Sequence, residues 1–168
     1  MVAWKLASRD GGHNKFLESM MIWVLVQAPR YWWQEADTYR LSTKQSESTM
    51  HTLVKELQRI TKVTNLVEHE ASLRQWAVDN FEDQFIISQD TLNRLQMLAV
   101  SGDLVGLKGL LPEGFLQRRV WCFSYKTLRN MILQRRNHRL PHWKCFLKET
   151  LEHIDHPELL PGVCNEKD

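Results

Sequence analysis

Long hydrophobic runs, clustered cysteines and an excess of one charge are all missing from this sequence. The longest apolar run, Met20–Val26, is too short to cross a bilayer, and no signal-peptide pattern follows Met1. The three cysteines are widely spaced, so they predict neither a disulfide framework nor a metal site, and they favour a reducing cytosol. The net charge of +2 points to no particular partner. We therefore expect a cytoplasmic protein with no membrane segment and no bound metal.

The short motifs of the common catalytic classes are missing as well. The sequence contains no Walker loop, no Gly-rich dinucleotide turn, no Ser-His-Asp order and no Cys-His nucleophile. Six arginines between positions 118 and 139 lie among aromatic residues, a composition seen in nucleic-acid-binding proteins. However, Arg118 and Arg119 point to opposite sides of a predicted strand, so the arginines form no continuous basic stripe. This pattern disfavours nucleic acid as the partner.

Many helices and few strands are predicted. The apolar content of 43% and the 168 residues suit a single globular domain with its own core, and we expect most of the seven tryptophans in that core. Strands are predicted over Met20–Ala28, which is too apolar to be exposed on either face, and over Leu116–Tyr125. Helices are predicted over 1–12, 30–39, 48–60, 70–81, 88–98, 126–135 and 141–154, and residues 41–47 form a predicted loop. The predicted class is α+β, with a small antiparallel sheet packed against several long helices.

One arginine stands out within the predicted helix 126–135. The apolar face of this helix carries Leu128, Met131 and Ile132. Arg135 falls within roughly 60° of all three, because a helix turns about 100° per residue. An unpaired guanidinium is prohibitively costly to bury, so we expect an anionic or carbonyl-rich partner to meet Arg135 inside. The alternative is a helix rim from which Arg135 reaches water. Arg129 and Arg136 point elsewhere and are expected to be solvated.

Two further positions have the chemistry of an anion site. The segment Ser46-Glu47-Ser48-Thr49 begins a predicted helix, and its hydroxyls and unpaired backbone N–H groups suit a phosphate. The same residues also suit a simple helix cap at Ser48 or Thr49. Lys108, which precedes Leu110-Leu111-Pro112, is open to the same two interpretations.

Several fragments occur in an order that is typical of one family. In the first half these are Gly12-His13 before the first strand, Ala28-Pro29 at its end, and Arg40 separated by seven residues from Ser48. In the second half they are Lys108, Leu111-Pro112, Trp121, Ser124-x-Lys126-Thr127-Leu128, Asn130 and Arg135. With these residues and spacings the chain resembles flavin-dependent thymidylate synthases, particularly a shortened, divergent form such as phages carry. The resemblance covers about residues 12–50 and 106–145.

The resemblance implies a reaction and an assembly. Members of this family reductively methylate dUMP to dTMP with FAD, NADPH and methylenetetrahydrofolate, and they are homotetramers whose active sites combine subunits. The reduced flavin delivers hydride to the uracil ring, so the protein supplies binding, orientation and charge rather than a strong nucleophile. That division of labour agrees with the missing catalytic motifs.

The resemblance also assigns roles to individual residues. Arg135 matches the arginine at the uracil carbonyl region and Ser48 the signature serine beside the nucleotide, so these two are the candidate catalytic residues. Lys108 matches an arginine near the nucleotide phosphate. The candidate cofactor-binding residues match positions near flavin or folate, and they are His13, Arg40, Lys126 and Asn130.

The chain departs from the family pattern at its signature. Thr38-Tyr39 stands where the family has Arg-His, which removes two groups that contact flavin and nucleotide. Losing one charge-assisted contact to a phosphate costs about 1.5–3 kcal/mol, and the candidates to compensate are Arg30, Lys44 and Tyr39. Two alternatives therefore stay open. One is a nucleotide-binding homologue of the same fold without catalysis, and the other is a basic helical protein that binds nucleic acid or a protein partner.

Overall fold

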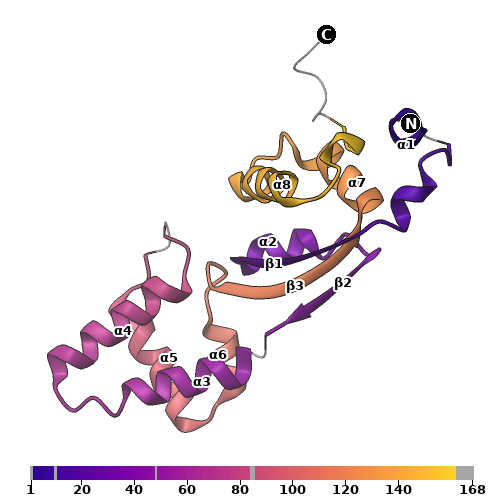
Figure 1. Cartoon of the computed structure of the whole chain (residues 1–168). Helices are drawn as coiled ribbons and strands as arrows, with labels where there is room; N and C mark the ends of the chain where they lie inside the picture. Colours follow the sequence, from indigo (N-terminus) through magenta and orange to yellow (C-terminus); the bar gives the residue numbers. More distant parts are fainter. Residues whose placement is uncertain (1, 10, 48, 84–85, 162–168) are drawn as a thin grey trace. The chain divides into compact units, whose positions relative to one another are not determined.

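The chain folds around a small sheet of three strands. The computed structural model describes residues 2–9, 11–47, 49–83 and 86–161. Strands β1 (Met21–Pro29), β2 (Ser42–Ser46) and β3 (Leu116–Ser124) form an antiparallel sheet in the order β1-β3-β2, so β3 is central. Eight α-helices accompany this sheet within those ranges (Figure 1). The predicted α+β class is confirmed.

Two compact units make up the chain. The terminal unit comprises Met1–Val26, Ala36–Gln45 and Val120–Asp168, and the central unit comprises Gln27–Glu35 and Ser46–Arg119. The helical elements of the terminal unit are α1 (Ala3–Ala7), η1 (Lys15–Glu18), α7 (Tyr125–Arg135), α8 (Pro141–His153) and η2 (Pro157–Leu159). The helices of the central unit are α2 (Arg30–Ala36), α3 (Thr49–Ile60), α4 (Leu66–Asn80), α5 (Gln89–Ser101) and α6 (Leu104–Leu110). The last residue of α2, Ala36, belongs to the terminal unit. The single-domain prediction stays a prediction.

Aromatic rings fill the core of the terminal unit, where α7 lies beside α8 (Figure 1). The ring of Trp121 on β3 lies 4.9 Å from that of Phe123 and 5.4 Å from that of Phe146 on α8. The centre of the Trp143 ring lies 6.0 Å from that of Phe146 and 5.8 Å from that of Tyr39, and aromatic rings attract each other at these distances. The prediction that most tryptophans are buried is confirmed for Trp32, Trp33, Trp76, Trp121 and Trp143.

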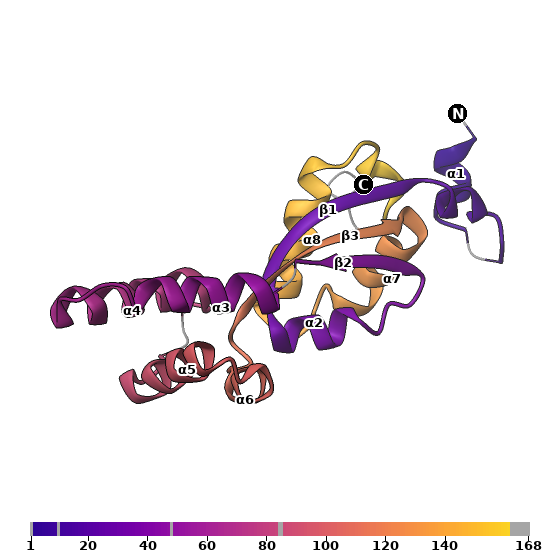
Figure 2. The same ribbon diagram turned by 90° about the horizontal axis from the view of Figure 1, so that it is seen from below.

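The central unit is a helical bundle around α5, which contacts α3, α4 and α6 (Figures 1 and 2). Its leucine-rich core includes Leu57, Leu73, Leu92, Leu95 and Leu107. Side-chain caps begin the helices: Asn65 accepts hydrogen bonds from the first turn of α4, and Ser88 accepts one from the first turn of α5. Gly102 ends α5 with a φ of 75°, a left-handed conformation that glycine adopts without strain. None of the described helices is long and apolar enough to span a bilayer.

One face of the sheet in the terminal unit is apolar and open. Met21, Trp23 and Leu25 alternate along β1 and are 52%, 70% and 69% exposed. Val120 on the neighbouring β3 is 39% exposed. The prediction that this strand is buried on both faces is therefore wrong for the single chain, because no described segment covers the face that these side chains share.

Other predicted elements are confirmed or corrected. The strand over Leu116–Tyr125, the helix from Ser88 and the helix that Pro141 opens are confirmed. The predicted loop over 41–47 is wrong, because Ser42–Ser46 pairs with β3 as the strand β2. The helix α6 was not predicted. The helices predicted over 1–12 and 30–39 are shorter in the structure, and α4 begins four residues before the predicted start at Glu70.

Candidate functional site

Arg135 lies half-buried at the C-terminal end of α7, on the face that also carries the buried Leu128 and Met131. Its Nε donates a hydrogen bond of 3.1 Å to the Oη of Tyr39. The guanidinium carbon lies 5.0 Å from the centre of the Trp143 ring, where the electron-rich face of the indole attracts a cation. The guanidinium is thus held against an aromatic wall and reaches the surface of the terminal unit.

The expectation that Arg129 is solvated is wrong. Arg129 is only 8% exposed, because α7 packs against both η1 and α8 and so has little free surface in its first turns. Arg136 is exposed, as predicted.

Tyr39, which the sequence resemblance matches to the signature histidine, forms a hydrogen bond with Arg135. Its side chain is 9% exposed, and its Oη both accepts from Arg135 Nε and donates to the Oε1 of Gln134 over 3.0 Å. Tyr39, which departs from the family pattern, is therefore a core residue whose hydroxyl orients the candidate catalytic Arg135. Lys44 lies near the same cluster, with its Nζ 4.7 Å from the centre of the Trp121 ring.

We expect Tyr39→Phe to lower the free energy of unfolding by about 1 kcal/mol, because the ring remains and only the hydroxyl with its hydrogen bonds is lost. Urea denaturation followed by circular dichroism measures this change. An unchanged denaturation midpoint would mean that the hydroxyl contributes nothing to holding Arg135.

Two of the four predicted cofactor-binding residues lie on the first turns of α7, and the chain next to the other two forms hydrogen bonds with this part of the helix. Lys126 and Asn130 are four residues apart on this helix, so they lie on one side of it. The Nζ of Lys126 donates to the Oδ1 of Asn14, which follows His13 and is fully buried. On the other side of the helix start, the hydroxyl of Thr127 donates to the backbone oxygen of Leu41, the residue after Arg40. His13, Arg40 and Asn130 are themselves exposed.

A single copy of α7 does not bring Lys126 and Arg135 together. The two residues are nine positions apart, which corresponds to roughly half a turn around the helix and about 13 Å along its axis. The predicted flavin-proximal group and the predicted pyrimidine-proximal arginine therefore face different directions in one terminal unit.

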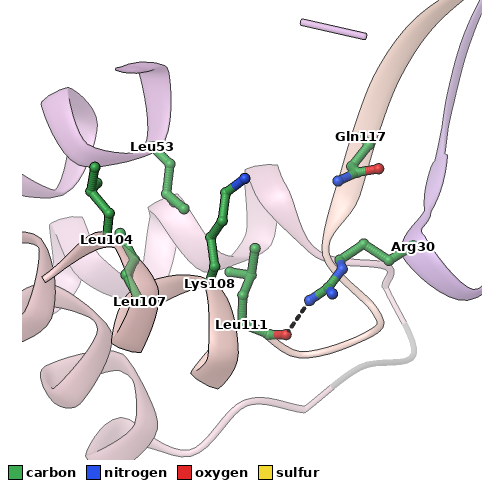
Figure 3. A pocket seen from close by; sticks show the side chains of 7 residues that line it. All are labelled: Arg30, Leu53, Leu104, Leu107, Lys108, Leu111 and Gln117. Atoms are coloured by element: carbon green, nitrogen blue, oxygen red, sulfur yellow. Dashed lines mark hydrogen bonds between the residues drawn. The ribbon is translucent and has the colours of Figure 1, made fainter. Parts of the chain in front are cut away.

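The central unit contains a pocket that combines cationic and apolar side chains (Figure 3). Leucines from α3 and α6 and the residue that follows α6 form the apolar part, and they are Leu53, Leu104, Leu107 and Leu111. Lys108 on α6, Arg30 at the start of α2 and Gln117 on β3 supply the polar part. Lys108, predicted to lie near a phosphate, thus lines a pocket with a second cation.

Arg30 is fixed by contacts within the central unit. Its Nη1 donates to the backbone oxygen of Leu111 over 2.5 Å, and its Nη2 lies 3.4 Å from the Oε1 of Glu113 (Figure 3). Arg30 is followed by Tyr31, whose hydroxyl donates to the carboxylate of Glu82. Burial and that carboxylate raise the pKa of the Tyr31 phenol, so Tyr31 remains a neutral donor at physiological pH.

The remaining candidate residues are placed as follows. Ser48 lies outside the described residues, so its predicted phosphate and catalytic roles stay predictions. Sequence reasoning missed Asn14 and Gln117. Neither belongs to a motif, and Gln117 stands beside Arg118 and Arg119 in the polar first half of β3, so no signal in the sequence singles it out. Within the described part of the chain, no group of three or more His, Cys, Asp or Glu side chains is arranged to hold a metal ion.

Known proteins match this chain in its three-dimensional structure but not in its sequence. No protein-family model matches the chain, and no curated protein matches its sequence. The fold is similar to that of the flavin-dependent thymidylate synthase ThyX from Helicobacter pylori complexed with FAD and dUMP, with a TM-score of 0.74 and 17% identity over 95% of this chain and 80% of that one. A second structure of that Helicobacter pylori protein with FAD and dUMP has a TM-score of 0.70 and 16% identity, over 93% of this chain and 77% of that one.

A third similar structure is a UMP/dUMP methylase, PolB from Streptomyces cacaoi, bound with 5-Br dUMP. Its TM-score is 0.56, with 15% identity over 90% of this chain and 71% of that one. The chain therefore has a ThyX-like fold, and the resemblance predicted from its sequence is confirmed at the level of the fold.

Proposed function

We propose that this chain, with its ThyX-like fold, is a flavin-dependent thymidylate synthase that converts dUMP to dTMP with FAD, NADPH and methylenetetrahydrofolate. The observation that carries the proposal is the fold match, which extends over 95% of the chain and whose counterpart was crystallised with FAD and dUMP. Each of the three similar structures has a uracil nucleotide or its bromo analogue bound. The order and spacing of residues along the chain support the same assignment independently of the fold.

In this proposal three residues act on the nucleotide. Arg135 orients and polarises the pyrimidine through its permanently charged guanidinium, which Tyr39 and the Trp143 ring hold in place. Lys108 and Ser48 bind the phosphate. No side chain has to attack the substrate, so catalysis by the protein consists of positioning and charge.

The four predicted cofactor-binding residues fit FAD by their donor chemistry. His13, Arg40, Lys126 and Asn130 all offer N–H groups, whereas the phosphates and ring carbonyls of FAD are acceptors. Lys126 already donates to Asn14, and its ammonium retains further protons for an acceptor. When bound, the reduced flavin would supply the hydride, and these residues would hold and orient it.

An absorbance titration tests the cofactor assignment. We expect the purified protein to be yellow or to bind added FAD, with a shift of the flavin absorbance bands. Protein that stays colourless and binds no FAD at high micromolar concentration would contradict the proposed function.

A homologue that binds nucleotide without turnover is the second candidate. The observation that favours it is the replaced signature pair, since Thr38 is exposed and Tyr39 is buried against Arg135 and Trp143. Neither side chain then offers a charged group to flavin or nucleotide. This candidate shares nucleotide binding with the first and differs from it in the absence of product.

We propose that the chain assembles as a homotetramer, and the open face of β1 supports this. An exposed row of Met21, Trp23 and Leu25 is typical of a surface that another protein surface covers. The separation of Lys126 from Arg135 around α7 also suits active sites completed by a second subunit.

We expect Trp23→Glu to convert the assembly to smaller species, because a carboxylate cannot be buried unpaired in an apolar interface. Light scattering coupled to size exclusion measures the mass. Trp4→Glu, at a 53% exposed tryptophan of α1, is the matched control and should leave the mass unchanged. Equal masses for Trp23→Glu and the unmodified protein would exclude this face as an interface.

A further inference from the structure

Asn14 is a polar residue whose side chain is completely buried in the terminal unit. It is 0% exposed and directly follows the exposed His13. Its Nδ2 donates to the backbone oxygen of Ala7, the last residue of α1, over 3.3 Å. Its Oδ1 accepts a hydrogen bond from the Nζ of Lys126 in the first turn of α7. Both ends of the amide are thus paired, as the burial of a polar group requires.

The backbone on both sides of Asn14 holds this amide in place. Gly11 and Gly12 precede it with φ angles of 74° and 93°, left-handed conformations that glycine adopts without strain. After Asn14 the chain enters η1, which packs against α7. At the far end of this segment, the backbone N–H of Tyr125 donates to the backbone oxygen of Met20 over 2.8 Å. Backbone structure therefore brings Asn14 next to the first turn of α7.

The contact with Asn14 fixes the ammonium group of Lys126 and leaves its charge intact. The amide oxygen is a neutral acceptor, and Lys126 forms no ion pair and no other hydrogen bond within the part of the chain that the structure describes. By contrast, the Nζ of Lys44 in the same unit lies 3.6 Å from the carboxylate of Asp37. Lys126 is half-buried, and a cation in such a place without a carboxylate partner favours an anionic ligand.

We propose that Asn14 is a positioning residue that acts through Lys126 and holds its ammonium group toward FAD without neutralising it. The inference rests on the proposed function, which assigns Lys126 to FAD and gives Asn14 no role. A fixed cation binds an anionic group more tightly than a mobile one, because less side-chain entropy is lost when the ligand arrives. An aspartate at position 14 would instead pair with the ammonium and compete with the ligand. Because His13 is the neighbouring residue, the same anchor fixes the backbone of a second predicted cofactor-binding residue.

Two substitutions of nearly the same size test the positioning role. Asn14→Asp keeps an acceptor for Lys126 and adds a charge that neutralises it, so we expect FAD binding to weaken by about tenfold to a hundredfold in an absorbance titration. Asn14→Leu removes the acceptor and leaves the ammonium charged, so we expect a loss of only about twofold to fivefold. A merely structural role predicts the reverse order, because leucine loses both hydrogen bonds of the amide and aspartate loses one.

Asn65→Asp is the matched control for the added charge. The exposed Asn65 caps α4 in the central unit, and aspartate caps a helix as well as asparagine does. FAD binding should therefore be unchanged in this variant, and a loss equal to that of Asn14→Asp would overturn the specific role of position 14.

Lys126→Met shows whether Asn14 acts through Lys126. We expect this variant to weaken FAD binding by about tenfold to a hundredfold, as Asn14→Asp does. Adding Asn14→Leu to it should change FAD affinity by less than about twofold, because the group that Asn14 positions is gone. If the two losses multiply instead, Asn14 acts independently of Lys126, and the positioning role is overturned. Circular dichroism checks that each variant is folded. If Asn14→Leu alone does not fold, equal FAD affinities of Asn14→Asp and Lys126→Met support the role.

The outcomes distinguish this inference from the proposed function. An Asn14→Asp protein that binds FAD as tightly as the unmodified chain would overturn the positioning role and leave the function in place. A larger loss for Asn14→Leu than for Asn14→Asp would show a structural role and overturn the inference in the same way. An unmodified protein that binds dUMP and no FAD would instead overturn the cofactor assignment, and with it both the proposed function and the role of Asn14.

Discussion

Replacing Arg135 with leucine is expected to lower kcat for dTMP formation by about a hundredfold to a thousandfold, which is the effect of removing one fixed donor from a developing negative charge. The guanidinium is oriented before substrate arrives, since Tyr39 and the Trp143 ring hold it. Leucine preserves the apolar contacts of the stem, so the fold should survive. Arg135→Lys should recover part of the activity, because it keeps the charge and loses the planar geometry.

Release of tritium from position 5 of labelled dUMP measures this effect, with circular dichroism and FAD binding as checks on folding. Arg136→Leu is the matched control: Arg136 is the next residue of the chain, is exposed, and should keep full activity. An Arg135→Leu protein that is folded and turns over at the normal rate would remove Arg135 from the mechanism.

The second large effect is on stability. We expect Trp121→Ala to lower the free energy of unfolding by about 3–5 kcal/mol, because it empties the centre of the aromatic core in the terminal unit. Trp121 is fully buried and contacts the rings of Phe123 and Phe146, neither of which can move to fill the space of an indole without losing its own contacts.

Urea denaturation measures this loss, and Trp4→Ala is its control. Trp4 is 53% exposed, so its truncation should change the free energy of unfolding by less than about 0.5 kcal/mol. Equal losses for the two variants would mean that the ring cluster around Trp121 is not the core of this unit.

The elements that the sequence predicts well are those whose stability is local. The helix α8 begins at Pro141, and α5 begins after Ser88 and ends before Gly102, and each of these residues acts through its own backbone chemistry. The strand β2 could not be found in this way. Its residues, Ser42–Ser46, are polar, and they are a strand because they pair with β3, which lies far away in the sequence.

Two other errors have different physical causes. The helix α6 contains Gly106 and Gly109, which weaken local helix propensity, and it is stabilised by the Asp103 cap and by the burial of Leu107. The prediction that β1 is buried on both faces fails because an apolar run indicates that a face must be covered, but not whether the same chain covers it.

The candidate site was predictable where it consists of ordered motifs, and not where it depends on tertiary contacts. Helical spacing pointed to Arg135, and the resemblance to the family pointed to Lys108. The coupling of Tyr39 to Arg135 joins residues 96 positions apart, and the orientation of Gln117 depends on Arg119. Such pairings follow from the packing of elements, so no pattern along the chain encodes them.

We propose that this chain transforms a pyrimidine nucleotide and does not only bind it. The most direct measurement is tritium release from labelled dUMP by the unmodified protein, supplied with FAD, NADPH and methylenetetrahydrofolate. We predict release that requires each of the three additions and is accompanied by stoichiometric dTMP. A folded protein that binds FAD and dUMP and releases no tritium would contradict the claim.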